Sequence, residues 1–243
     1  METRLSIIVP LYNETRRIKA GIDGIREYLD QSKVPVEVVL VDDGSRDETA
    51  KIARDLIGND SRFRLVAYTP NQGKGHAVKQ GILAAKGEIR LFTDIDLSVP
   101  IETADLFIAA IDDGNDVVIG TRRTAQSNVE VHQPKIREMF GEGFRRFARS
   151  IFAPEVTDLT CGFKAFKAEA ADRIFSHSLI KRWVFDVEIM FLASRWKFSI
   201  HEIPVTWINS PDTKVNLGLD IARSAVEMAV IRLNWFLGKY PKK

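Results

Sequence analysis

Two aspartates separated by one residue, Asp94 and Asp96, follow an apolar run at residues 89–93. In extended chain, residues two apart project to the same side, so both carboxylates can face one cation. Carboxylate oxygens suit a hard cation such as Mg²⁺ or Mn²⁺, which keeps coordination positions for phosphate oxygens. Such a metal would offset the charge of a departing nucleotide diphosphate. A helix entry is the alternative, because Pro100 follows, but the position after an apolar run favours a metal site.

Polar residues also follow two other apolar runs. The loop at residues 71–75 contains glycines that permit close backbone approach, and its Lys74 can contact a phosphate as a point charge. It is not a dinucleotide-binding fingerprint, because Val78 stands where the third glycine belongs. The pair Asp42 and Asp43 can accept hydrogen bonds from a ribose or a base. The alternatives are a flexible turn for the loop and a helix cap for the pair.

The apolar runs alternate with helical stretches through the first half of the chain. Runs rich in Val, Ile and Leu, as expected for buried strands, lie at residues 5–10, 36–41, 63–68, 89–93 and 116–120. Apolar residues at three- and four-residue spacing occupy residues 15–30, 47–57, 75–85 and 101–112. This alternation predicts an α/β fold, with a mainly parallel sheet covered by helices on both faces. Ligands of such folds bind beyond the carboxyl ends of the strands, where the polar residues are expected to meet.

The pattern changes after residue 122. We predict strands at residues 162–166 and 200–207 and helices at residues 135–152, 185–194 and 217–237. In the first of these helices, an aromatic and apolar stripe runs along one face, formed by Phe140, Phe144, Phe147 and Ile151. The helices at 135–152 and 217–237 combine an apolar face with charged residues, which is typical of helices that lie on a membrane surface. Core packing explains either helix equally well.

Composition excludes several classes of protein. The net charge of +2 is too small to indicate a nucleic-acid partner. The single cysteine, Cys161, excludes an intramolecular disulfide and a cysteine-based zinc site, and it suits a reducing cytoplasm. The apolar run at residues 5–9 is too short for a signal peptide or a membrane span, and nowhere do eighteen uncharged apolar residues follow one another. We therefore expect a cytoplasmic protein that does not cross a membrane by its own helices.

The motifs at the strand ends resemble those of family 2 glycosyltransferases of the GT-A type. They are I-V-P-L-Y-N-E at residues 8–14, V-D-D-G-S-R-D-E-T at 41–49, N-Q-G-K-G at 71–75, T-D-I-D-L at 93–97, G-T-R-R at 120–123 and D-L-T-C-G-F-K-A-F at 158–166. Together they are most similar to polyprenyl (dolichyl) phosphate sugar synthases, and in particular to the dolichyl-phosphate glucosyltransferase-like group. The resemblance implies one Rossmann-like GT-A domain over residues 1–243, with a nucleotide-sugar half (1–123) and an acceptor half (124–243) that carries C-terminal amphipathic helices.

The resemblance also implies a set of site residues. Nucleotide-sugar binding is expected for Pro10, Tyr12, Asn13, Glu14, Asp42, Asp43, Gly44, Ser45, Lys74, Gly75, Asp94, Ile95, Asp96 and Arg122. Asp94 and Asp96 are expected to bind Mg²⁺ or Mn²⁺ in catalysis. The cations expected at the acceptor phosphate are Arg122, Arg137, Lys164 and Lys214. For Asp158 we consider three roles: orienting the acceptor-side arginines, acting as a base for a hydroxyl acceptor, or capping a turn.

These residues suit transfer of a sugar to a lipid phosphate. A phosphate monoester has a second pKa near ~6, so at neutral pH it is largely dianionic and can attack the anomeric carbon without a general base. It needs cations that position it and a metal at the leaving diphosphate. The resemblance further implies inversion, a polyprenyl or dolichyl phosphate acceptor, peripheral contact with the cytoplasmic face of a membrane, and UDP-glucose as donor. The donor is chosen because the segments at 158–164 and 183–188 look most like the glucosyl group.

Several alternatives stay open from the sequence. The donor can be GDP-mannose or UDP-N-acetylglucosamine, and a soluble hydroxyl acceptor would require a working base. A catalytically inactive nucleotide-sugar-binding module is disfavoured by the intact pair Asp94 and Asp96. A signalling receiver domain is disfavoured because receivers carry their acidic pair after the first strand, whereas here the pair follows the second. A homodimer is neither required nor excluded.

Overall fold

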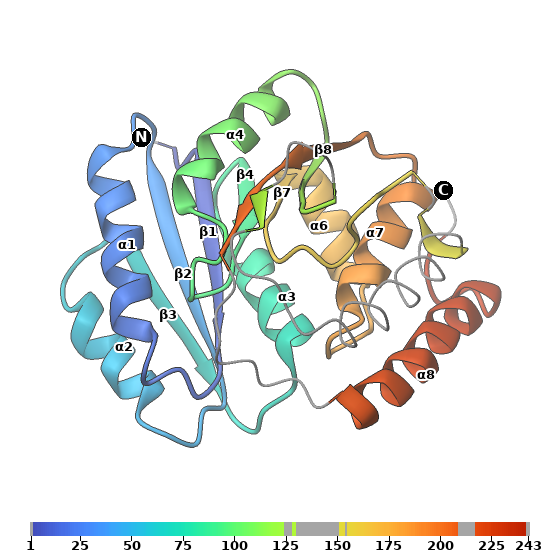
Figure 1. Ribbon diagram of the computed structural model, residues 1–243, viewed down its shortest axis with the longest axis horizontal. Coiled ribbons are helices and arrows are strands. Elements are labelled where there is room, and N and C mark those ends of the chain that lie inside the picture. The colour runs from blue at the N-terminus through green and yellow to red at the C-terminus, as the bar shows by residue number, and fades with distance from the viewer. Residues whose placement is uncertain (1, 124–127, 130–150, 154, 209–216, 242–243) are drawn as a thin grey trace.

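The computed structural model describes residues 2–123, 128–129, 151–153, 155–208 and 217–241 (Figure 1). A seven-stranded sheet has the order β3-β2-β1-β4-β7-β5-β8. Its strands are β1 (Leu5–Leu11), β2 (Val36–Asp43), β3 (Phe63–Tyr68), β4 (Ile89–Phe92), β5 (Val117–Thr121), β7 (Lys164–Lys167) and β8 (Ile200–Pro204). All neighbouring strands pair parallel except β7, which is antiparallel to both β4 and β5. A second, two-stranded sheet pairs β6 (Asn128–Val129) with β9 (Thr206–Trp207).

Helices cover both faces of the large sheet. They are α1 (Ile18–Gln31), α2 (Thr49–Ile57), α3 (Lys74–Ala84), the short 3₁₀ helix η1 (Ile101–Thr103), α4 (Ala104–Asp112), α6 (Ala168–His177), α7 (Phe185–Arg195) and α8 (Leu217–Phe236). Figure 1 shows α1, α2 and α4 on one side of the sheet and α3, α6 and α7 on the other. Alternate residues of a strand point to opposite faces, so in β1 Ile8 joins the core under α3, α6 and α7 whereas Ile7 joins the core under α1 and α4.

The predicted α/β architecture is confirmed, and the strands and helices of the first half begin and end close to the predicted residues. Helix α6 and the antiparallel direction of β7 were not predicted. Both halves of the chain contribute to one hydrophobic core, because the cluster under α3 extends from Ile8 to Tyr240. The predicted helix at residues 135–152 lies almost entirely outside the described residues, and so do Phe140, Phe144 and Phe147.

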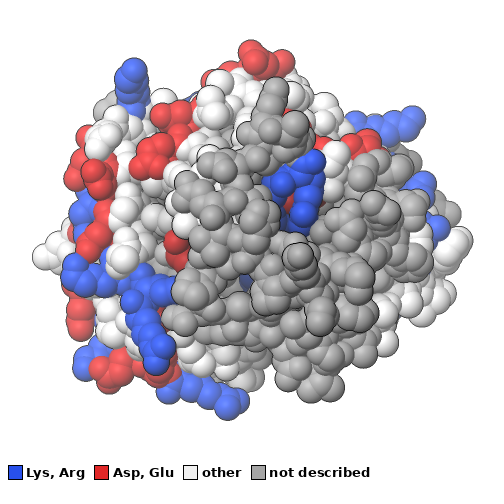
Figure 2. Space-filling model, in the orientation of Figure 1, with Lys and Arg blue, Asp and Glu red and all other residues white. Residues whose placement is uncertain are grey.

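The described helices include none with the length and apolar character needed to cross a membrane. Figure 2 shows acidic side chains gathered over α1 and α4 and basic side chains around α2 on the face in view. Neither sign of charge covers the whole described part of that face. Charged side chains of each sign are therefore grouped locally on this face. The candidate site is formed by the charged side chains at the strand ends.

Candidate active site at the strand ends

The loops after β1 and β2 lie side by side, because Leu11 pairs with Asp42 where these parallel strands end. The Asn13 N–H donates to Ser45 Oγ at 2.9 Å, and the Arg46 N–H donates to Asn13 Oδ1 at 2.8 Å. Asn13 has a φ of 54°, in the left-handed region that Asn tolerates better than most residues. The structure thus brings together the predicted nucleoside residues of both loops, Pro10, Tyr12, Asn13, Glu14, Asp42, Gly44 and Ser45.

Asp43 has a structural role at the end of β2. Its buried carboxylate accepts hydrogen bonds from Asn71 Nδ2 at 2.7 Å and from the Gln72 and Gly73 N–H groups, each at 2.8 Å. These three contacts use the carboxylate to shape the loop before α3. Asp43 is thus held by protein groups in this conformation, and its expected contact with a nucleotide stays a prediction.

Asp42 is arranged differently. Its Oδ2 accepts one hydrogen bond from the Ser45 N–H at 3.2 Å, while the buried Oδ1 has no hydrogen-bond partner in the described part of the chain. A buried acceptor left without a donor destabilises the fold by about 1–3 kcal/mol. Of the two aspartates, Asp42 is therefore the one whose carboxylate suits a hydrogen-bond donor of a bound nucleoside.

The glycines of the loop at residues 71–75 contact protein. A Cβ on Gly73 would lie 2.6 Å from the Lys181 carbonyl oxygen, and Gly73 has a φ of 110°. A Cβ on Gly75 would lie 2.5 Å from Phe185 Cβ, and Gly75 is buried. Close approach is needed as predicted, but the partners are Lys181 before α7 and Phe185, the first residue of α7. The expected contact between Gly75 and the nucleotide is not supported by this packing.

Lys74 begins α3, and its Nζ lies 2.5 Å from Asp94 Oδ1. Burial alone would lower the pKa of Lys74, but Asp94 and Asp186 outweigh burial and raise it. Lys74 is therefore a stable cation beside the first aspartate of the pair. Gly162 makes room for this contact, because a Cβ there would come within 2.6 Å of Asp94 Oδ2.

The extended geometry predicted for the aspartate pair is wrong. Strand β4 ends at Phe92, and the Leu97 N–H donates to the Asp94 carbonyl oxygen at 3.1 Å, which closes a turn in which Leu97 has a φ of 47°. Ile95, within this turn, is buried, and its carbonyl oxygen and side chain pack so closely on Gly21 that a Cβ there would clash with both. The Ile95 side chain therefore belongs to the core, and its expected contact with the nucleotide is not through the side chain.

Asp96 has protein partners on both carboxylate oxygens. Oδ1 accepts hydrogen bonds from the Ser98 N–H at 3.1 Å and from Ser98 Oγ at 2.9 Å, while Oδ2 lies 3.3 Å from Arg17 Nη1. Arg17 also donates through Nε to Glu14 Oε2 at 2.8 Å. Arg17 thus connects two predicted site residues from separate loops. Arg17 was not predicted, because the sequence signals it only as a basic residue three positions after Glu14.

Arg122 and Asp158 form a bidentate ion pair at the end of β5. Arg122 Nε lies 2.7 Å from Asp158 Oδ2 and Nη2 lies 2.9 Å from Oδ1, while the guanidinium stands 5.5 Å from the Trp207 ring centroid. Burial would raise the pKa of Asp158, but the Arg122 guanidinium outweighs burial and holds this pKa well below its usual range. Asp158 is fully buried, so of the three roles considered the structure favours orienting an arginine over acting as a base, and a direct part of Asp158 in catalysis stays a prediction.

Glu202 in β8 holds the segment that carries Asp158. Its carboxylate accepts hydrogen bonds from the Thr157 N–H at 2.9 Å and from the Asp158 N–H at 3.2 Å. Thr157 Oγ1 in turn lies 2.9 Å from Thr121 Oγ1 at the end of β5. Glu202 was not identified from the sequence, because a single glutamate in a predicted strand carries no motif.

Lys164 and Asp186 form a second ion pair, inside the protein. The Lys164 side chain is fully buried, its Nζ contacts an Asp186 carboxylate oxygen, and it donates to the Cys161 carbonyl oxygen at 2.6 Å. In this conformation the ammonium is enclosed by protein, and the expected contact of Lys164 with an acceptor phosphate stays a prediction. Burial raises the pKa of Asp186, and Lys164 and Lys74 oppose that change. Asp186 was not predicted from the sequence, because it stands in no charged motif at a strand end.

The two remaining predicted phosphate ligands, Arg137 and Lys214, lie outside the described residues. Their assignment stays a prediction.

Comparison with known proteins decides the family of this site. The sequence matches Glycosyl transferase family 2 over residues 6–175. The chain belongs to this glycosyltransferase family. The match includes the loops after β1, β2 and β4, Lys74 and both ends of the Arg122–Asp158 pair, and the family resemblance inferred from the motifs is confirmed.

Relatives of this family 2 glycosyltransferase match it over nearly its whole length. It is 33% identical to the dolichyl-phosphate beta-glucosyltransferase of Saccharomyces cerevisiae, with 98% of this chain and 77% of that protein covered. It is 32% identical to the dolichyl-phosphate beta-glucosyltransferase of Dictyostelium discoideum, with 96% and 75% covered. The structure of glucosyl-3-phosphoglycerate synthase from Mycobacterium tuberculosis in complex with Mn²⁺, UDP and glucosyl-3-phosphoglycerate has a TM-score of 0.62 at 19% identity, covering 99% of this chain and 81% of that one. That likeness establishes the GT-A fold.

In this glycosyltransferase, charges of opposite sign alternate behind the strand ends. Lys74 contacts Asp94, Lys164 contacts Asp186, and Asp186 raises the pKa of Lys74. Arg122, 18% exposed, is held at one side of this series by a fully buried carboxylate. The arrangement fixes cations at the strand ends, and fixed cations of this kind stabilise phosphate charge.

Proposed function

We propose that this chain transfers glucose from UDP-glucose to a polyprenyl or dolichyl phosphate, with inversion at the anomeric carbon. The class of acceptor is inferred from the burial and the ion pair of Asp158. The one residue considered as a base for a hydroxyl acceptor is a fully buried carboxylate in a bidentate pair with Arg122. A lipid phosphate needs no such base, because its own dianion is the nucleophile. The named activity of the relatives in yeast and Dictyostelium supports the same donor sugar and acceptor.

In this proposal the site residues stabilise the charge of the substrates and position them. Lys74 and Arg122 offer cations to the phosphate groups that meet between the strand ends, and the fork of Arg122 is held ready by Asp158. Asp42 is proposed to accept a hydrogen bond from the nucleoside through its unpartnered Oδ1. Each charge-assisted hydrogen bond of this kind contributes about 1.5–3 kcal/mol.

The residues present fit a divalent cation. Asp94 is 42% exposed and offers carboxylate oxygens, the donors that Mg²⁺ and Mn²⁺ prefer, and Asp96 follows in the same turn. Asp94 is the better placed ligand, because its contact with Lys74 involves Oδ1 alone, whereas both oxygens of Asp96 already have protein partners. When bound, the metal would neutralise charge that develops on the leaving diphosphate.

A donor screen tests the reaction. Purified protein is incubated with labelled UDP-glucose, GDP-mannose or UDP-N-acetylglucosamine and farnesyl phosphate, with Mg²⁺, Mn²⁺ or EDTA. We expect label from UDP-glucose in the organic phase and none after chelation. Label that stays in the aqueous phase as a glucoside of an added hydroxyl acceptor would contradict the proposal.

The metal assignment is tested by Asp94→Asn. We expect at least about a hundredfold loss of turnover, in line with the several kcal/mol that a metal supplies, in a variant whose cooperative urea unfolding shows that it is still folded. Asp55→Asn, which removes an exposed carboxylate on α2, is the control and should retain activity. Full turnover of Asp94→Asn in EDTA would remove Asp94 from the metal site.

We also propose peripheral contact with the cytoplasmic face of a membrane. Support comes from five exposed apolar residues on and just after α8: Val226, Val230, Leu233, Phe236 and Leu237. Cosedimentation with vesicles tests the contact. It should fall when Phe236, 74% exposed, is replaced by Ser, and equal binding of parent and variant would contradict the role of α8. Fractionation of cells that express the protein tests the location.

A further inference from the structure

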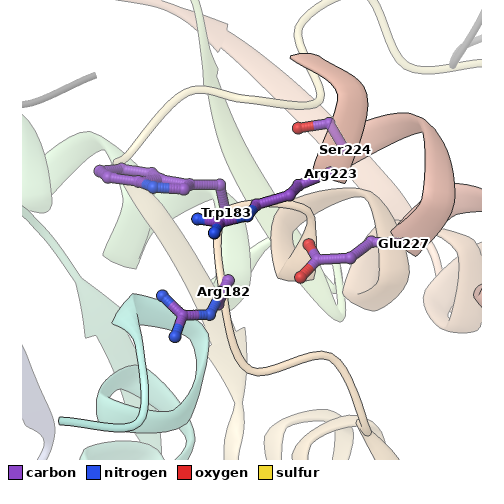
Figure 3. A pocket seen from close by; sticks show the side chains of 5 residues that line it. All are labelled: Arg182, Trp183, Arg223, Ser224 and Glu227. Carbon is purple, nitrogen blue, oxygen red and sulfur yellow. The ribbon is translucent and has the colours of Figure 1, made fainter. Parts of the chain in front are cut away.

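The segment that joins α6 to α7 (residues 178–184, the α6–α7 segment) packs along α3. Lys79 Nζ on α3 donates to the Ser178 carbonyl oxygen at 2.7 Å, and the His76 N–H donates to the Lys181 carbonyl oxygen at 3.0 Å. Near α7 the segment faces α8 across a small pocket, which is lined by Arg182, Trp183, Arg223, Ser224 and Glu227 (Figure 3). The α6–α7 segment therefore lies between α3 and α8.

The α6–α7 segment sets the position of Lys74 through the glycines on either side of it in the sequence. A Cβ on Gly73 would lie 2.6 Å from the Lys181 carbonyl oxygen, and a Cβ on Gly75 would lie 2.9 Å from the Ile180 carbonyl oxygen. Such distances leave no room between the loop and the segment. Because Lys74 stands between these two glycines, a shift of the segment would displace its ammonium from the proposed diphosphate site.

A buried carboxylate on α7 holds the same segment from inside the protein. Glu188 is fully buried, and its Oε2 accepts hydrogen bonds from the Leu179 N–H at 3.0 Å and from the Ile180 N–H at 2.9 Å. Both N–H groups lie within two residues of the Lys181 carbonyl oxygen that binds α3. Since a buried N–H without an acceptor destabilises the conformation that contains it, the carboxylate selects the position of the segment.

The Glu188 carboxylate is itself fixed by the stretch of chain after α8. Tyr240, 1% exposed, donates through its hydroxyl to Glu188 Oε1 at 2.5 Å. The Trp196 indole N–H donates to the Pro241 carbonyl oxygen at 3.0 Å, which anchors the same stretch at the end of α7. Glu188 thus contacts the α6–α7 segment on one side and Tyr240 on the other, so an effect of Glu188 on the strand-end site passes through the segment.

We propose that Glu188 is a positioning residue for the donor, and that Tyr240 holds it in place. By fixing the α6–α7 segment against the loop at residues 71–75, Glu188 keeps the Lys74 ammonium beside Asp94, where the donor diphosphate is proposed to bind. The proposal rests on the proposed function for the role of Lys74. It gives two buried residues, one on α7 and one after α8, a part in donor binding.

Calorimetry with UDP and Mn²⁺ tests Glu188 without any transfer step. Glu188→Met keeps the length of the side chain but accepts neither N–H, so UDP affinity should fall about tenfold or more, the loss expected when Lys74 no longer makes a charge-assisted hydrogen bond. Glu188→Gln should stay close to the parent, because its amide oxygen can accept from the segment and its NH₂ can donate to Tyr240. Ser6→Ala, which removes a buried hydrogen bond from the Gly87 N–H at the amino end of β1, is the control for lost stability. Parental UDP affinity in a folded Glu188→Met overturns the proposal.

A double-mutant cycle shows whether Glu188 acts through Lys74. Lys74→Met and Glu188→Met should each weaken UDP binding, and the double variant should bind no more weakly than Lys74→Met alone, because two residues that serve one interaction are not additive. Additive losses would overturn the proposal, since they would mean that Glu188 supports the fold in general. Full UDP affinity in Lys74→Met would contradict the role of Lys74 in the proposed function, and this inference with it. A weakened Lys74→Met beside an unchanged Glu188→Met would overturn this inference alone.

Tyr240→Phe gives a test that leaves the buried carboxylate in place. It removes one hydroxyl, so the KM for UDP-glucose should rise about two- to tenfold, the range expected for one hydrogen bond, and the KM for farnesyl phosphate should stay at the parent value. Tyr28→Phe is the matched control and should leave both KM values unchanged, because the buried Tyr28 also donates to a carboxylate, that of Asp105, at 2.9 Å. No rise for UDP-glucose, or an equal rise for both substrates, would overturn the positioning role.

Discussion

Two buried ion pairs lie behind the same strand ends, and they differ in how they use their charges. In the Arg122–Asp158 pair the carboxylate is fully buried but the arginine is 18% exposed, so the pair delivers a cation to the site. In the Lys164–Asp186 pair the lysine is fully buried and the aspartate is 9% exposed, so the pair presents neither charge to the site. One pair presents a charge to ligands, and the other keeps its charges within the protein.

The chemistry of the two cations explains the contrast. The guanidinium of Arg122 makes two parallel hydrogen bonds to Asp158 and still offers the rest of its edge. The Lys164 ammonium has three N–H donors, and it contacts Asp186 and the Cys161 carbonyl oxygen. Because its side chain is fully buried, it offers no donor to a ligand. The carboxylates respond in opposite ways: the Asp158 pKa falls because Arg122 outweighs burial, whereas burial raises the Asp186 pKa. The comparison indicates that motif lysines and arginines at strand ends are not interchangeable phosphate ligands.

The largest expected effect comes from breaking the inner pair. Lys164→Met leaves Asp186 buried without its cation and should reduce the free energy of unfolding by about 3–5 kcal/mol. The double variant Lys164→Met with Asp186→Leu should recover most of that loss, because no buried charge remains. Urea unfolding of the parent, both single variants and the double variant measures the coupling between the residues.

The pH dependence of Lys164→Met sharpens this test. The pKa of Asp186 is raised in the folded state, so the folded protein binds the proton more tightly than the unfolded chain does. The stability of the variant should therefore be greater near about pH 5 and fall as the pH rises through the raised pKa. A variant equally stable across this range would show that Lys74 or solvent compensates for Asp186.

A smaller effect, on activity, is expected from the outer pair. Arg122→Lys keeps the charge but loses the fork, so the efficiency toward prenyl phosphate should fall about ten- to hundredfold, the equivalent of one or two lost hydrogen-bond contributions. Arg54→Lys on α2 is the matched control. If Arg122→Lys retained parent efficiency at limiting acceptor, the outer pair would be as structural as the inner one.

The smallest effect concerns acid stability. Because the folded-state pKa of Asp158 lies below its unfolded value of about 4, the pair stabilises the fold fully above that pH, and the contribution is lost as the pH falls through the lowered pKa. Asp158→Asn should reduce stability by about 1.5 kcal/mol at neutral pH. The difference from the parent should shrink below about pH 4. A difference that grows on acidification would mean that Asp158 is not ionised in the folded protein.

Local signals in the sequence were sufficient for most of the elements, though not for helix α6 or the direction of β7, and for the convergence of polar residues at one edge of the sheet. Apolar runs predicted the parallel strands, and residues after them proved to lie at one edge because parallel strands bring their carboxyl ends together. The pattern of motifs predicted the family, which the comparisons confirm. The protein partners of Asp43, Lys164 and Asp158 could not be predicted in the same way, because they depend on which groups meet in space.

What the sequence by itself determined is therefore the α/β fold, the strand-end location of the charged residues and the family. Only the tertiary structure decided which charges face a ligand. Strand β7 enters between β4 and β5 with Lys164 opposite Phe92 on one side and Ile119 on the other, and this position places the lysine inside the sheet. The ion pairs join residues 36 and 22 positions apart, on elements whose proximity follows from strand order. No local pattern encodes such a pairing, because burial and partner depend on contacts between distant segments.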